Sequence, residues 1–168
     1  MTNVTGSIPE AMCQAEELIV AVECELATCS CCECTSLLRR NQEIFNEVVF
    51  DLLSDETRRN INEEGSPPKQ ALDWLVHNHD LESFRPHRII QRFVLALLFY
   101  ETRGSEWNQK DGWLDETLSE CDWLTSSHDG PCDARGVFYE LILVDNNLNG
   151  ALPVDLVLLD KLGKCTGV

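Results

Sequence analysis

The cysteines are the residues of this 168-residue chain with the most obvious reactivity, and their spacing is uneven. Six of the nine lie in the first 34 residues, and the next one is Cys121. Five thiols fall within 11 residues, at Cys24, Cys29, Cys31, Cys32 and Cys34. Short Cys-x-Cys spacings can bind zinc or another soft metal as thiolates. Zinc sites usually combine two separated ligand pairs, so disulfides are the favoured interpretation, and free thiols in a reducing compartment are a further one.

No other group of side chains predicts catalysis. His77 and His79 form an H-x-H pair, but they follow an expected helix end, where histidine interacts favourably with the helix dipole. The carboxylates occur in runs such as Glu63-Glu64, which are typical of solvated helix ends. Nucleophile-elbow, phosphate-loop and zinc-protease motifs are all missing from the sequence. We therefore predict no enzyme, no catalytic residue and no cofactor.

The net charge of the chain excludes some classes of binding partner. Asp and Glu total 29 against 13 Lys and Arg, a formal net charge of -16. Such a surface repels nucleic acid and anionic membranes, because phosphate contacts need clustered basic residues. The longest apolar run, Phe93 to Tyr100, is too short to span a bilayer. A protein or peptide partner is expected, with no transmembrane segment in this chain.

Three stretches of the middle of the chain have helical periodicity. The first has apolar residues at every fourth position, at Ile44, Val48 and Leu52. In the second, Ser66 precedes two prolines, which is a typical helix start. The third begins at Pro86 and should end near Gly104, a natural residue to follow a helix. We expect the tryptophans after it to belong to the core; they are Trp107, Trp113 and Trp123.

Residues 138 to 162 carry the most specific pattern, FYELILVDNNLNGALPVDLVLLDKL. It matches L-x-x-L-x-L-x-x-N-x-L-x-G-x-I-P-x-x-L-x-x-L, with a framework of Leu141, Leu143, Asn146, Leu148, Gly150, Leu152, Pro153, Leu156 and Leu159. Leu141 and Leu143 should point inward from a short parallel strand, and Asn146 should bond the backbone of the turn that follows. Gly150 and Pro153 should shape the return path. The segment resembles one repeat of the plant-type leucine-rich-repeat family.

The preceding region, from about Gln70 to Leu143, resembles the N-terminal cap of the algal variety of that family. The resemblance rests on ALDWL, QRFVLALLFYET, DGWL and ECDW. In the family a helix caps the open end of the solenoid and two cysteines pair. The resemblance therefore implies a disulfide between Cys121 and Cys132, which would stabilise the fold by about 3 kcal/mol.

The start of the chain resembles the other end of such an array. Val4, Gly6, Ile8, Pro9 and Met12 match the second half of a repeat, and CELATCSCCEC resembles its cysteine-rich close. If the repeat has a period of 24 residues, the last and the first residue of the chain occupy consecutive positions of the repeat. One hypothesis is that the strand at Leu18 to Val22 lies parallel beside Tyr139 to Val144, within one chain or by head-to-tail association of copies. The alternative is a fragment, or a join between two repeat regions.

These patterns predict an α+β fold in which a helical N-terminal cap leads into a short, incomplete leucine-rich-repeat solenoid. The expected segments are 1–35, 36–66, 67–137 and 138–168. The resemblance implies a non-catalytic recognition module of a receptor-like or secreted protein, at the cell surface or outside the cell, although the first twenty residues lack a secretory signal. Its concave-face contacts would include Glu140, Ile142, Val144 and Asp145. The alternative function is a small metal-binding or thiol-redox protein that uses Cys24 to Cys34.

Overall fold

The computed structural model describes residues 6–7, 27–28, 36–110, 112–123, 130–159 and 164–166. The chain divides into two compact units, Met1–Arg40 and Asn41–Val168. In the first unit, β1 (Gly6–Ser7) pairs parallel with β2 (Ala27–Thr28). The expected strand at Leu18 to Val22 and the cysteines from Cys13 to Cys34 lie outside the described residues.

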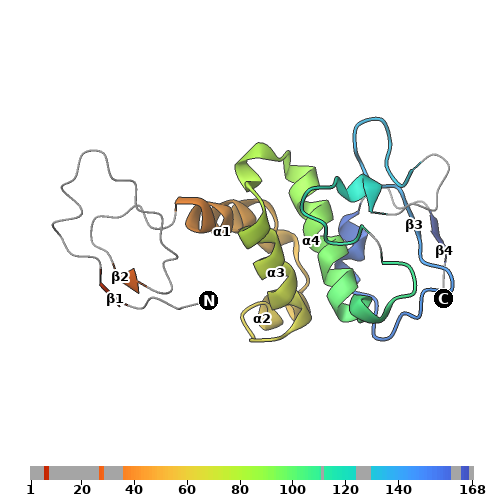
Figure 1. Cartoon of the computed structure of the whole chain (residues 1–168), viewed down its shortest axis with the longest axis horizontal. Coiled ribbons are helices and arrows are strands. Elements are labelled where there is room, and N and C mark those ends of the chain that lie inside the picture. Colours follow the sequence, from red (N-terminus) through yellow and green to blue (C-terminus); the bar gives the residue numbers. More distant parts are fainter. Residues whose placement is uncertain are drawn as a thin grey trace. The chain divides into compact units, whose positions relative to one another are not determined.

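Helices make up most of the rest of the described chain (Figure 1). The α-helices are α1 (Ser36–Val48), α2 (Asp55–Asn60), α3 (Pro67–Asn78) and α4 (Pro86–Glu101). The short 3-10 helices η2 (Phe50–Leu52) and η3 (Leu81–Ser83) lie between α-helices. Three more follow α4; these are η4 (Gly104–Glu106), η5 (Glu120–Asp122) and η6 (Val154–Leu158). Two strands, β3 (Glu140–Ile142) and β4 (Lys164–Thr166), complete the second unit. The structure confirms the three predicted helices and adds α2, which was not predicted.

The predicted start of α3 is confirmed, whereas the predicted end of α4 needs a correction. The Ser66 hydroxyl accepts a hydrogen bond from the Lys69 backbone N–H, and Pro67 takes the first helical position. Beyond α4, it is Arg103 and not Gly104 that adopts left-handed backbone angles. Gly104 is needed for packing, because a Cβ there would overlap the ring of Phe99.

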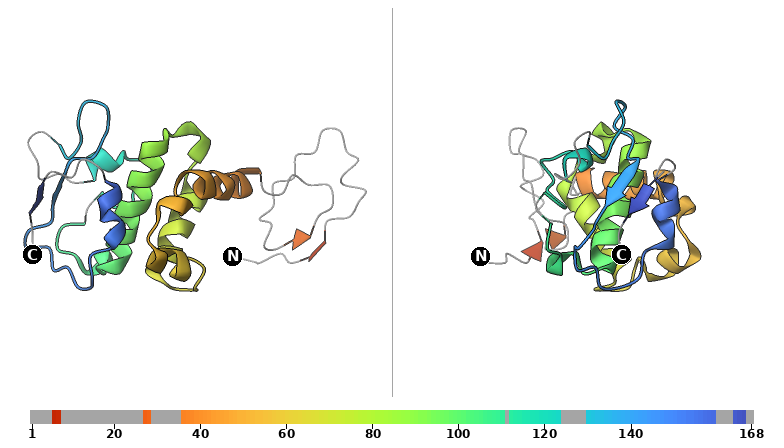
Figure 2. Two further views of the ribbon diagram at one scale, coloured as in Figure 1. Left: turned by 180° about the vertical axis from the view of Figure 1, so that it is seen from behind. Right: turned by 90° about the vertical axis from the view of Figure 1, so that its right-hand side faces the viewer.

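Helix α4 forms the centre of the second unit. It packs against α3 on one side and against η6 on the other (Figures 1 and 2). Its residues from Phe93 to Leu98 are therefore fully buried. The prediction that the tryptophans belong to the core is confirmed, because Trp107, Trp113 and Trp123 are all buried and contact one another edge-on or at a tilt.

The predicted fold class is wrong. The described chain is mostly helical, its strands are two or three residues long, and no solenoid is present among the described residues. A single leucine-rich coil cannot bury its own faces. In this chain the repeat-like segment packs on α4 through η6 instead, so α4, which was the predicted cap helix, and this segment share one core. The segments predicted as 36–66, 67–137 and 138–168 accordingly fall, from Asn41 onward, within one compact unit.

No helix in the described ranges is both long and apolar enough to cross a membrane.

Candidate interaction surface

The repeat-like segment contains β3 near its start, and β3 pairs in parallel with β4, just beyond the end of the segment. Glu140 lies opposite Lys164, Leu141 opposite Cys165, and Ile142 opposite Thr166. Each residue of β3 is thus paired with the residue 24 positions further along the chain, which is the period assigned to the repeat.

The nine predicted framework residues differ in their burial, and Gly150 and Leu152 are exposed. Leu141, Leu143, Asn146 and Leu159 are buried, and Leu148, Pro153 and Leu156 are half-buried. Leu152 belongs to the same framework but is 59% exposed. The framework therefore holds most of the segment against the unit and leaves one of its leucines in solvent.

Asn146 bonds a different partner from the one that the sequence suggested. Its amide N–H donates to the Gln109 carbonyl at 3.0 Å, and its amide oxygen accepts from the Gln109 backbone N–H at 2.5 Å. Gln109 lies in the loop after η4, and not in the turn that follows Asn146. This side chain therefore ties the repeat-like segment to the cap-like region before it.

Gly150 brings the returning chain against the end of α4, in keeping with the path-shaping role predicted for it. Its φ of 144° is one that side chains disfavour, and a Cβ would overlap the carbonyl oxygen of Glu101. The neighbouring Asn149 N–H donates to the Thr102 carbonyl at 3.1 Å. The two backbones are in direct contact at this point.

Asp155 fixes the next part of the segment to α2, a role that sequence reasoning missed. Its buried carboxylate accepts hydrogen bonds from the Ser54 backbone N–H at 2.6 Å, the Ser54 hydroxyl at 3.0 Å and the Thr57 hydroxyl at 2.5 Å. Ser54 is also the N-cap of α2. A negative charge is stabilised at a helix N-terminus, so Asp155 anchors η6 firmly.

The anchored segment exposes several large apolar side chains. Leu152 is 59% exposed, Val154 64% and Val157 71%. We call these three residues the apolar rim. Of the predicted concave-face contacts, Val144 and Asp145 are exposed, whereas Glu140 and Ile142 are half-buried.

A small cavity of about 70 Å³ lies beside the rim, between α2, the end of α4 and the returning chain. We call it the acidic pocket; its lining residues are Ser54, Glu56, Thr57, Asn60, Pro68, Glu101, Ala151, Leu152, Pro153 and Val154. Partial burial and the negative charge of Glu56 raise the pKa of Glu101. Neither glutamate forms an ion pair with a Lys or Arg within the described part of the chain.

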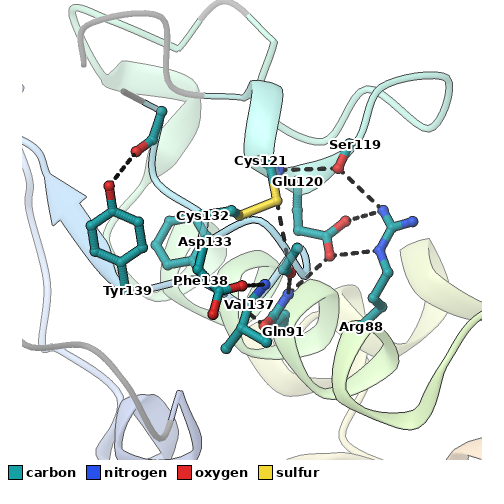
Figure 3. The surroundings of a disulfide bond; sticks show 12 residues. Arg88, Gln91, Ser119, Glu120, Cys121, Cys132, Asp133, Val137, Phe138 and Tyr139 are labelled. Atoms are coloured by element: carbon teal, nitrogen blue, oxygen red, sulfur yellow. Dashed lines mark hydrogen bonds and ion pairs between the residues drawn. A yellow bond between two sulfur atoms is a disulfide. The ribbon is translucent and has the colours of Figure 1, made fainter. Parts of the chain in front are cut away.

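A second acidic group, Glu120, lies beside the disulfide and is fully paired (Figure 3). Cys121 and Cys132 form the disulfide that the family resemblance implied, with their Cα atoms 5.5 Å apart. The Glu120 carboxylate accepts hydrogen bonds from Arg88 Nε at 2.9 Å, from Gln91 Nε2 at 3.0 Å and from an Arg92 guanidinium nitrogen at 3.1 Å. Burial raises the pKa of Glu120, but the hydrogen bond and charge of Arg88, with the charge of Arg92, leave that pKa below its usual value.

Arg92 extends this buried network to His79. The guanidinium lies over the ring of Trp123 at 5.1 Å and donates to His79 Nε2 at 2.9 Å. His79 donates in turn from Nδ1 to the Leu75 carbonyl at 3.0 Å, so the ring is neutral. Burial and the charge of Arg92 lower the pKa of His79 to about 4. Arg92 of α4 is thus bonded both to Glu120 of η5 and to His79, the residue after α3.

Of the metal-binding candidates from the sequence, only the histidine pair lies among the described residues. No group of three or more His, Cys, Asp or Glu side chains there could hold a metal ion. His79 is committed to Arg92, and His77 is exposed and bonded to the Asp73 carbonyl. Cys24, Cys29, Cys31, Cys32 and Cys34 lie outside the described residues.

Comparisons with protein-family models, with curated proteins and with solved structures found no match to this chain.

Proposed function

We propose that this chain is a non-catalytic protein-interaction module related to the cap and first repeat of plant-type leucine-rich-repeat proteins. The observation that carries the proposal is the apolar rim. Leu152, Val154 and Val157 lie in solvent within six residues of one another. Grouped exposed apolar residues mark interaction sites more often than isolated ones do.

The rigid anchoring of the rim supports the same function. Asp155 lies between two rim residues and is bonded to Ser54 and Thr57 of α2. Gly150 is packed on the backbone of α4 two residues before Leu152. A surface held in place by its scaffold loses little conformational entropy when a partner binds, which favours affinity.

The family relationship is supported by three local features. These are the 24-residue offset between β3 and β4, the buried Asn146 and the disulfide after the cap-like helix. The proposal needs no solenoid, because the rim and its anchors belong to a single repeat-like turn on a helical body.

A peptide selection tests this function. We expect the full chain, purified with its disulfide intact, to enrich saturable binders from a displayed library of random dodecapeptides. Hydrogen exchange should then show slower exchange in residues 144–157 when a binder is added. A matched selection should use the Val154→Ser, Val157→Ser double variant, which removes two rim residues that are already exposed. The proposal is wrong if no saturable binder emerges, or if the binders protect only other elements and bind this variant equally well.

A further inference from the structure

We propose that the acidic pocket receives a Lys or Arg side chain of a partner protein, while an apolar residue next to it in the partner sequence covers the apolar rim. This inference rests on the proposed interaction function and adds the place and the chemistry of the contact.

The size of the pocket restricts what it can hold. Its volume of about 70 Å³ is room for roughly five water-sized groups, since a cavity needs about 10–15 Å³ to hold one water. Pockets for drug-sized ligands and cofactors are far larger, at about 300–1,000 Å³. The end of one long side chain fits, whereas a nucleotide or an aromatic cofactor does not.

The polar lining favours a cation. Glu56 and Glu101 are the two acidic residues of the lining, and Asn60 is a further polar residue there. Partial burial and the nearby charge of Glu56 both disfavour the ionised form of Glu101. Since neither is paired with a basic residue in the described ranges, a guanidinium or ammonium group between them would relieve the repulsion and gain hydrogen bonds.

The rim and the pocket are one continuous surface. Leu152 and Val154 line the pocket and are also more than half exposed. A basic side chain in the pocket would therefore bring its neighbour in the partner sequence against these two residues. Charged side chains with apolar stems, and apolar residues beside them, suit such a mixed surface.

The whole-chain charge favours the same partner. A net charge of -16 repels acidic proteins and attracts basic segments during encounter. The pocket is also distinct from the predicted concave-face residues, none of which lines it. The occupant is thus a basic and apolar protein segment that binds at the α2 and η6 side of the unit.

Two synthetic peptides test the inference directly. The probe is acetyl-Ala-Leu-Arg-Leu-Ala-amide, and its control replaces the arginine by citrulline, which has nearly the same shape without the charge. We expect the arginine peptide to shift the backbone NMR signals of Asn60, Glu101 and Val154, and to bind at least tenfold more tightly than the citrulline peptide. The difference should shrink as salt is raised, because it depends on charge.

Variants of the chain separate this inference from the general function. The Glu56→Gln, Glu101→Gln double variant should weaken the arginine peptide about tenfold and leave the citrulline peptide unchanged. Glu47→Gln, which removes an exposed carboxylate of α1 outside the pocket, should change neither. Equal binding of the two peptides, or unchanged binding by the double variant, would overturn the pocket assignment. If the pocket assignment failed but library binders still protected residues 144–157, the interaction function would stand. If no such binders were found either, both the pocket assignment and the interaction function would be overturned.

Discussion

Two glutamates show how differently this small unit treats the same side chain. Glu120 is fully buried and accepts hydrogen bonds from Arg88, Arg92 and Gln91. Glu101 is half-buried beside Glu56 and has no basic partner in the described part of the chain. A buried charge persists only when the protein supplies its partners. Glu120 therefore belongs to the internal structure, whereas Glu101 is a carboxylate that we propose receives a cation from a partner.

Removing the charge of Glu120 should have the largest effect. In a Glu120→Gln variant the buried guanidinium of Arg92 loses its ionic partner, and breaking a buried pair costs about 3–5 kcal/mol. We expect the free energy of unfolding, measured by urea denaturation, to fall by about 3 kcal/mol. A loss below about 1 kcal/mol would mean that water compensates Arg92 and that the network is not structural.

The effect of pH on the free energy of unfolding, through the same network, should be the second largest. His79 has a pKa of about 4 in the fold against 6.5 when exposed, so the folded state disfavours its protonation. The neutral imidazole of His79 therefore contributes to the free energy of unfolding. This contribution is complete above about pH 6.5 and is lost as the pH falls toward 4, a change on the order of 2 kcal/mol.

The measurement is urea denaturation between pH 7 and pH 4, compared with a His79→Gln variant. Other titrating groups are common to both proteins, so the difference between the two curves isolates His79. Parallel curves over this range would show that the imidazole does not titrate as the structure requires.

The smallest effect is expected at Glu101. Burial and Glu56 raise its pKa, so the ionised form is slightly unfavourable in the fold at neutral pH. Glu101→Gln should raise the free energy of unfolding by no more than about 0.5 kcal/mol, since the group is largely screened by solvent. Thermal denaturation at pH 7 measures this. A marked loss of stability would show that Glu101 has a structural partner after all, and the contrast with Glu120 would disappear.

Local sequence patterns were enough to predict α1, α3 and α4, because each combines apolar periodicity with a start signal or a long apolar face. Helix α2 has only six residues and no apolar stripe. Its signals were short-range and easily missed: Ser54 at the N-cap, acidic residues in the first turn and two arginines in the last. Tertiary contacts, which periodicity does not report, complete this helix.

The candidate site was less predictable than the helices. The repeat pattern located Gly150 and the buried Leu141 and Leu143, but not which leucine would remain in solvent. Glu101 and Glu120 cannot be distinguished in the sequence, because their difference depends on arginines and a glutamate brought close only by folding. The predicted solenoid was wrong for a related reason, since one repeat packs on whatever apolar surface the rest of the unit offers.

The hydrogen bonds from Ser54 to Asp155 join residues 101 positions apart in the chain. During synthesis the segment from Ser54 to Asn60 emerges long before the carboxylate that holds its first turn. Domains fold as units while the chain grows, and contacts between distant residues form late. The acidic pocket therefore cannot be completed before residues 151–155 have been made, and a nascent chain that stops before residue 155 would carry α2 without its anchor.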